Sequence, residues 1–211
     1  VKKPIKVLPN LVDREMFQKE VKEVPERYHV YKKEFVIIGV GQISPRKDIF
    51  TFIEAAKCLP DCRFLWVGGR PLGNLTAGIK ECDDAIKAAP KNVEFFTEVI
   101  PREEMPIAYQ VSDVFFLPSK QETFGIVVVE AAACGLPIIL RDLEVYKEIF
   151  KEGYLKGNNI EDFVKIIKKL KNDKKFYRTW KVKANLIADR YDKKKIANQL
   201  LGYYRELLKP D

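Results

Sequence analysis

Short apolar runs alternate with amphipathic segments along most of the chain. Runs that suit buried strands lie at residues 35–41, 63–67, 93–96, 113–117 and 137–140. Apolar positions recur with helical spacing at residues 45–59, 77–89, 101–110, 124–134 and 144–150. Strands that alternate with helices predict right-handed βαβ units and a parallel sheet that is covered on both faces.

This pattern predicts a Rossmann-like, doubly wound α/β domain over residues 1–160. Helical spacing continues in residues 161–211, as at Phe163, Ile167 and Leu170, and predicts a helical extension that packs on the domain. Ligands of open parallel sheets bind beyond the carboxyl ends of the strands. A site is therefore expected in the loops that follow the predicted strands.

The composition is that of an ordinary globular protein, but the 211 residues carry a net charge of +8. Part of the excess lies in a lysine-rich stretch at residues 165–183. Such a stretch is either a solvated helical face or a surface for anionic lipids, nucleic acids or phosphorylated ligands. The sequence has no apolar run of 18 residues and no signal-peptide pattern, and its cysteines form no CxxC pair, which favours a reduced, cytoplasmic protein.

Several common chemistries lack their motifs here. No GxGxxG follows the first predicted strand, which disfavours NAD or FAD binding. The chain also lacks the GxxxxGK[ST] motif of P-loop proteins and the GxSxG motif of α/β-hydrolases. Without DxD, HExxH or paired cysteines, no metal site is predicted.

One carboxylate lies within an apolar helical segment. Residues 126–129 before Glu130 and residues 131–133 after it are apolar, and a helix that is apolar all round is normally buried. A buried carboxylate has to be neutral, paired or hydrogen-bonded. A ribose diol can supply two hydroxyl donors for this purpose. The alternative is that Glu130 faces solvent or pairs with an Arg or Lys nearby.

Two predicted helix starts offer groups for an anion. Gly125 lies in the first turn of the helix that carries Glu130, where free N–H groups and the lack of a Cβ let a phosphate approach. Ser44 suits the N-cap and Pro45 the N1 position of the helix after the first strand, which places Lys47 in its first turn. A lysine there opposes the helix dipole, and such a local conflict hints at a site. An ordinary surface lysine and a plain strand–loop–helix connection are the alternatives.

Four segments together resemble the carboxyl-terminal domain of glycosyltransferase family 4, whose members are retaining enzymes of the GT-B fold. Residues 7–13 (VLPNLVD) resemble its interdomain PN-G-VD segment, with Leu11 where glycine is usual. Residues 41–47 (GQISPRK) resemble its diphosphate-binding G-R-x-x-x-x-K loop, and residues 92–99 (NVEFFTEV) its strand and base-contacting turn. Glu122 and Glu130 match its E-x7-E motif, and Ala-Cys-Gly-Leu-Pro follows.

The resemblance implies a nucleotide-sugar donor and a role for each matching residue. Glu130 would hold the ribose hydroxyls, Lys47 the diphosphate, and the catalytic residue Glu122 would orient the donor sugar. The base would lie against Val99, and the donor site would be completed by Gly41, Gln42 and the backbone of Phe124, Gly125 and Ile126. No metal or cofactor is implied, since Lys47 and helix N–H groups would stabilise the charge on the departing diphosphate.

Two positions depart from the family pattern. Gln42 replaces the usual arginine of the diphosphate loop and removes one positive charge, although Arg46 is close in sequence. Thr97 replaces a glycine that usually precedes the base turn. Both departures bear on the strength of donor binding more than on the fold.

Within the family, Val40-Gly41-Gln42 and Arg141-Asp142-Leu143 resemble bacterial enzymes that glycosylate diacylglycerol, often from UDP-glucose or UDP-galactose. The resemblance thus implies a UDP-hexose donor, a glycolipid product and a cytoplasmic enzyme at the inner face of the cell membrane, where positive charge and aromatic residues suit an anionic surface. It also implies a missing amino-terminal acceptor domain, towards which the helical extension packs. We expect the chain alone to bind donor without transferring the sugar, and we expect no nucleic-acid partner.

Two other interpretations are open. A non-catalytic basic α/β module for membrane surfaces or nucleic acid would explain the charge but not Glu130, and it would bind polyanions with a strong salt dependence. Another GT-B enzyme, such as a sugar-nucleotide epimerase, would share the fold, but the spacing of Glu122 and Glu130 argues against it.

Overall fold

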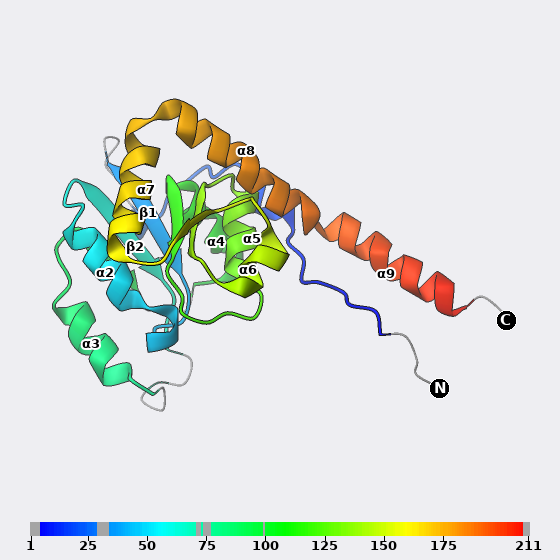
Figure 1. Cartoon of the computed structure of the whole chain (residues 1–211), viewed down its shortest axis with the longest axis horizontal. Coiled ribbons are helices and arrows are strands. Elements are labelled where there is room, and N and C mark those ends of the chain that lie inside the picture. The colour runs from blue at the N-terminus through cyan, green and yellow to red at the C-terminus, as the bar shows by residue number, and fades with distance from the viewer. Residues whose placement is uncertain (1–4, 29–33, 71–72, 74–76, 99, 209–211) are drawn as a thin grey trace.

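The computed structural model describes residues 5–28, 34–70, 73, 77–98 and 100–208. In this part of the chain, six parallel strands form one sheet in the order β3-β2-β1-β4-β5-β6. The strands are β1 Phe35–Val40, β2 Cys62–Val67, β3 Val93–Phe96, β4 Val114–Leu117, β5 Ile138–Arg141 and β6 Leu155–Gly157. Helices cover both faces of the sheet (Figure 1), which confirms the predicted Rossmann-like, doubly wound fold.

Helices connect the strands and extend the chain beyond the sheet. Those between strands are α2 Ile49–Lys57, α3 Ile79–Lys87, α4 Met105–Gln110, α5 Ile126–Ala133 and α6 Glu144–Phe150. The helices outside the alternation are α1 Arg14–Gln18, α7 Ile160–Asn172, α8 Lys174–Arg190 and α9 Lys193–Leu207. Short 3-10 turns lie at Glu26–Tyr28, Pro45–Lys47 and Arg102–Glu104.

The central strands are buried because the sheet is covered on both sides. Every side chain of β4 is buried, and so is every side chain of β1 after Phe35. Such continuous apolar strands are typical of parallel sheets, which carry helices on both faces. The strand order reverses between β1 and β4, and open parallel sheets bind ligands beyond the carboxyl ends of the strands at such a position.

The predicted helix at residues 45–59 is interrupted, so its predicted start at Ser44 was wrong. Ser44 makes no capping hydrogen bond, and a 3-10 turn at Pro45–Lys47 comes first. Asp48 follows in the left-handed region with φ 56°, and its carboxylate caps α2 by accepting from the Thr51 N–H at 3.4 Å. Lys47 therefore precedes α2 and does not oppose the dipole of that helix within its first turn.

Two further boundaries differ from the predictions. Gly125 lies before the first turn of α5, as its N-cap, with φ 83°. Strand β6 was not predicted, because a strand of three residues with an exposed Lys156 at its centre produces no apolar run.

Helices α7 and α8 pack on the same core as the sheet. Phe163 and Ile167 of α7, and Ala184 and Ile187 of α8, are buried in one hydrophobic cluster with the strands. Helix α8 lies along α5, which orders the helical extension against the element that carries Glu130.

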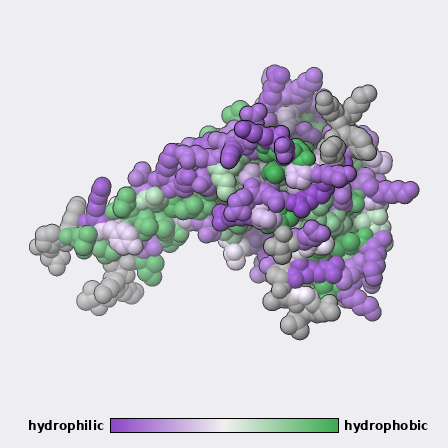
Figure 2. Space-filling view, turned by 180° about the vertical axis from the view of Figure 1, so that it is seen from behind, coloured by the Kyte–Doolittle hydropathy of each residue, from purple (hydrophilic) through white to green (hydrophobic). Residues whose placement is uncertain are grey.

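Helix α9 projects from this body, and the amino-terminal segment leaves on the same side (Figure 1). The two are joined where they leave: Val12 N–H donates to Tyr191 O at 2.8 Å, and Lys193 N–H donates to Val12 O at 3.0 Å. Farther out, Lys6 pairs with Glu206 at 2.8 Å. Figure 2 shows hydrophobic residues gathered along this arm. Its exposed members are Ile5, Val7, Leu8, Leu11, Leu201, Tyr204, Leu207 and Leu208.

Candidate functional site

The loops after β1, β2 and β3 meet at the carboxyl edge of the sheet. Gly41 N–H donates to Val67 O, and Ile43 N–H donates to Gly69 O, both at 3.0 Å. Gly68 has φ 142°, and a Cβ at this position would lie 2.2 Å from Gly41 O. Only glycine allows the loops to approach so closely.

A cavity of about 450 Å³ opens over this edge. Its walls come from the loops after β1, β2 and β3 and from the start of α4. The lining residues are Val40, Gly41, Gln42, Val67, Gly68, Gly69, Arg70, Thr97, Glu98, Ile100 and Met105. A concave, partly apolar space at the carboxyl edge of a parallel sheet is a typical position for a small-molecule site.

Lys47 and Glu122 form an ion pair beside this cavity. The aliphatic part of Lys47 packs over Gly41, where a Cβ would lie 3.2 Å from Lys47 Cδ. Its ammonium group donates to Glu122, whose side chain is only 5% exposed. Arg46 adds a second positive charge, with Nη1 3.6 Å from Glu122 Oε2. The site thus joins two cations to one carboxylate.

Arg141 holds the loops that carry this pair. Its guanidinium donates to Pro118 O at 2.9 Å, to Asn158 O at 2.8 Å and to Asp48 Oδ2 at 2.8 Å. Asp48 directly follows Lys47, and Pro118 begins the loop that leads to Glu122. One side chain therefore fixes the two loops relative to each other.

The start of α5 presents backbone rather than side chains. Gly125 has no Cβ, and the Phe124 ring points into the core, where it meets Tyr191 edge-on at 5.1 Å. Ile126 is 39% exposed. The first N–H groups of a helix have no acceptor within it, so this end of α5 can bind an anion.

Glu130 lies one turn into α5 and is 9% exposed, so it does not face solvent. The Tyr109 hydroxyl donates to Glu130 Oε2 at 3.0 Å, and this bond replaces the Arg or Lys partner that the sequence left open. Burial raises the pKa of Glu130, while the hydrogen bond from Tyr109 and the charge of Arg102 lower it. The carboxylate is thus buried with a single described hydrogen-bond donor.

The structure brings some of the predicted site residues together and leaves others apart. Gly41, Lys47 and Glu122 are in one cluster, and Gln42 is exposed at the wall of the cavity. Phe124 and Gly125 directly precede the helix that carries Glu130, and Ile126 is its first residue, but no hydrogen bond or ion pair joins Glu130 to Lys47 in the described part of the chain. Val99 lies outside the described residues.

Four contributors were missed from the sequence: Gly68, Tyr109, Arg141 and Met105. The Gly-Gly pair at residues 68–69 was a signal, because two glycines directly follow a predicted strand. Nothing in the sequence indicated the contacts of Tyr109 and Arg141, since their partners lie 21 and 93 residues away along the chain.

The described residues offer no cluster of three or more His, Cys, Asp or Glu side chains that could hold a metal ion. The four cysteines are free. Within the same residues, no helix combines the length and the apolar content needed to cross a bilayer.

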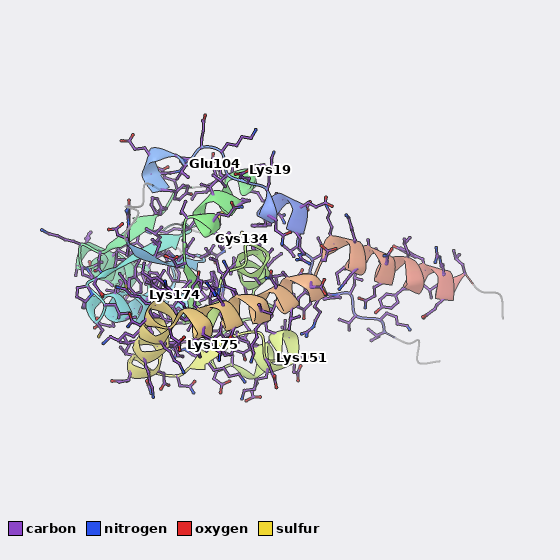
Figure 3. All side chains as sticks on the ribbon, turned by 90° about the horizontal axis from the view of Figure 1, so that it is seen from above. Lys19, Glu104, Cys134, Lys151, Lys174 and Lys175 are labelled. Carbon is purple, nitrogen blue, oxygen red and sulfur yellow. The ribbon has the colours of Figure 1, made fainter. Side chains whose placement is uncertain are left out.

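The lysine-rich stretch forms a basic surface on α7 and α8. Figure 3 places Lys174 and Lys175 at the start of α8, and Lys19 on the other side of the body. The aromatic residues of this stretch are covered by lysines: Lys169 lies 4.2 Å from the ring centre of Phe176, and Lys183 lies 4.5 Å from that of Trp180. Val182 and Leu186 are the apolar side chains of α8 that are more than half exposed.

Known proteins with the same sequence pattern identify the family. Residues 20–186 match the family described as Glycosyl transferases group 1, and the chain therefore belongs to this family. The match confirms the predicted relationship to glycosyltransferases of the GT-B fold.

Two curated relatives act on diacylglycerol lipids, according to their names. The alpha-galactosylglucosyldiacylglycerol synthase of Streptococcus pneumoniae is 31% identical over 94% of this chain and 54% of its own length. The processive diacylglycerol alpha-glucosyltransferase of Acholeplasma laidlawii is 34% identical over 81% of this chain and 52% of its own length. The chain thus spans about half the length of the curated relatives it matches.

Solved structures show the same fold at lower identity. Sucrose-phosphate synthase from Thermosynechococcus elongatus aligns with a TM-score of 0.82 and 23% identity, over 96% of this chain and 52% of that chain. HepE of Anabaena, solved with UDP-glucose, aligns with a TM-score of 0.79 and 23% identity, over 95% of this chain and 57% of that chain. Both are similar to this chain in fold.

Proposed function

We propose that this chain is the donor-binding domain of a retaining glycosyltransferase that moves a hexose from a UDP-sugar to an acceptor. The observation that carries the proposal is the meeting of Lys47 and Glu122, which are 75 residues apart, beside the cavity at the carboxyl edge of the sheet. Glu130 supports it as a buried carboxylate on the helix that begins next to this pair.

Lys47 and the start of α5 would bind the diphosphate. In the structure Lys47 is neutralised by Glu122, so an incoming diphosphate would share the ammonium group with this carboxylate. As the bond to the sugar breaks, negative charge grows on the diphosphate, and Lys47 and the free N–H groups of α5 would stabilise it. Glu122 would then be free to accept hydrogen bonds from the donor sugar. Neither role calls for a metal or another cofactor.

The nucleoside would occupy the cavity and the adjoining surface of α5. Glu130 would accept hydrogen bonds from the ribose hydroxyls, and the base would lie against the loop after β3 and Val99. UDP is favoured over other nucleotides because a relative from Escherichia coli is named for UDP-Gal, and HepE was solved with UDP-glucose.

A second domain would bind the acceptor. The chain matches only about half of its relatives, which agrees with a missing acceptor domain. The exposed apolar side chains of the arm, such as Leu207 at 79% exposure, would be covered by that domain. The amino-terminal segment and α9, which leave the body side by side, would connect the acceptor domain to the donor-binding domain.

The names of the relatives favour a glycolipid acceptor, and so a cytoplasmic enzyme bound to the inner face of the membrane. The basic surface of α7 and α8 would then attract anionic lipids. We expect Lys174→Glu with Lys175→Glu to weaken binding to phosphatidylglycerol-containing vesicles, measured by co-sedimentation. Lys19→Glu, on the other side of the body, is the control (Figure 3). Equal binding by both variants would place the lipid contact elsewhere.

Calorimetric titration tests the donor role. We expect saturable binding of UDP and UDP-glucose, and at least tenfold weaker binding of GDP-mannose and ADP-glucose. Glu130→Ala should weaken UDP binding, since it removes the proposed acceptor of the ribose hydroxyls. Absence of binding by all four nucleotides, both in this chain and after Gln42→Arg, would reject the donor role. Strong salt-dependent binding to polyanions instead would favour a basic binding module.

A further inference from the structure

Tyr109 connects the wall of the cavity to Glu130. It lies on α4 one helical turn after Met105, which lines the cavity. Its side chain is fully buried, and its ring packs against Phe17 and Phe115 with centroids 5.9 and 6.2 Å away. These contacts fix the orientation of the ring and therefore the position of its hydroxyl oxygen.

The Tyr109 hydroxyl donates a hydrogen bond to the Glu130 carboxylate. The distance to Glu130 Oε2 is 3.0 Å, and Val127 O lies 3.4 Å from the same hydroxyl. A hydroxyl has only one proton, and the nearer, charged acceptor makes the stronger bond. Burial and the charge of Glu130 hold the pKa of Tyr109 well above its ordinary value, so the hydroxyl remains a donor.

The bond leaves most of the carboxylate free to accept other donors. An ionised carboxylate offers about four lone-pair sites on its two oxygens. Tyr109 occupies one of them on Oε2, and no described residue donates to Oε1. Glu130 also keeps 9% of its surface exposed, so a ligand can reach it.

We propose that Tyr109 is a positioning residue of the donor site, whose hydroxyl orients the Glu130 carboxylate to accept from a ribose diol. The proposal rests on the proposed function, because it requires a nucleotide at Glu130. Tyr109 itself touches no ligand; it fixes the group that does.

The test compares UDP with 2′,3′-dideoxy-UDP, which lacks both ribose hydroxyls. We expect the unaltered chain to bind UDP about 10- to 100-fold more tightly than the dideoxy analogue. Tyr109→Phe should weaken UDP binding about 5- to 20-fold and leave binding of the analogue within about twofold. Circular dichroism and urea unfolding would check that the variant is folded.

Tyr154→Phe is the matched control. Tyr154 is also buried, and its hydroxyl has no hydrogen-bond partner among the described residues, so its removal should change neither affinity. If Tyr109→Phe weakens both ligands equally, or neither, the positioning role is wrong. If the unaltered chain binds the two ligands equally, the ribose role of Glu130 is wrong, and with it that part of the proposed function.

The pH profile gives a second, independent readout. Tyr109 from α4, Arg102 from the 3-10 turn before α4 and Cys134, the C-cap residue of α5, face Glu130. Burial raises the pKa of both Cys134 and Tyr109, so Glu130 is the group of this cluster whose protonation changes at lower pH. Without the hydrogen bond from Tyr109, the pKa of Glu130 rises further. UDP-glucose affinity should then begin to fall at a higher pH in Tyr109→Phe, and an unchanged profile would contradict the proposal.

Discussion

At the scale of the residue, the buried carboxylate of Glu130 should make donor binding depend on pH. Burial raises the pKa of this group above its ordinary value. As the pH falls through the raised pKa, Glu130 takes up a proton and loses acceptor capacity, so UDP-glucose affinity should begin to fall at a higher pH than an ordinary carboxylate would give. Glu130→Gln should bind about 10- to 100-fold more weakly and lose most of this dependence. A pH profile that is the same in both proteins would contradict the assignment.

The same raised pKa has the opposite consequence for stability. The cost of holding a charged carboxylate in the core is present above the raised folded-state pKa. This cost is relieved as the pH falls from the folded-state pKa to the unfolded-state pKa of Glu130, because the folded protein binds the proton more readily than the unfolded chain does. Glu130 alone therefore favours folding at lower pH, while it favours donor binding at higher pH.

Gln42 offers a gain-of-function prediction at the same scale. It is exposed at the wall of the cavity, in the same loop as Lys47. Gln42→Arg should tighten UDP binding about 3- to 10-fold, because a guanidinium can make charge-assisted bonds to phosphate. The gain should shrink as salt is added. Gln18→Arg adds the same charge on α1, and an equal gain there would show only a long-range charge effect, measured by the same calorimetry.

At the scale of the element, close contact between loops builds the edge of the cavity, and glycine makes it possible. Gly68→Ala would place a Cβ 2.2 Å from Gly41 O at φ 142°, so it should cost about 3 kcal/mol or more in urea unfolding. Gly73 has φ 50° with nothing near its Cβ position, so Gly73→Ala should cost only about 1 kcal/mol. Equal losses would mean that the loops can separate without penalty.

The elements themselves were largely predictable, whereas their contacts were not. Continuous apolar runs such as that of β4 leave a local signal. The pairing of Lys47 with Glu122 leaves none, because it depends on how two distant loops meet. Likewise, Asp48 rather than Ser44 starts α2 because its carboxylate caps the helix and binds Arg141, a partner 93 residues away.

At the scale of the whole molecule, one compact body carries the candidate donor site, and an apolar arm leaves it. The sheet, α7 and α8 share one core, while Leu207 and Leu208 at the far end of α9 are almost fully exposed. The arrangement suits a domain that binds donor by itself and needs a partner for transfer. The family and the fold follow from the sequence, and the candidate site lies at the predicted edge of the sheet, but the course of the arm does not follow from the sequence.

The chain alone should therefore bind UDP-glucose and form no glycolipid. Product formation from radiolabelled UDP-glucose and diacylglycerol in mixed micelles would be measured beside the calorimetric titration. We expect binding without product, because the acceptor would be held by a domain outside these residues. Glycolipid formed by this chain, and abolished by Glu122→Gln, would show instead that the acceptor site lies within it.

The most direct measurement of the central claim is the mapping of UDP-glucose by backbone amide chemical shifts in nuclear magnetic resonance. The largest changes are expected in the Gly41–Lys47 loop, at Gly68 and Gly69, and from Gly125 to Glu130. Amides of α3 and of the far end of α9 should stay unchanged. Shifts confined to the basic surface of α7 and α8, or no shifts with saturating ligand, would contradict a donor site at the carboxyl edge of the sheet.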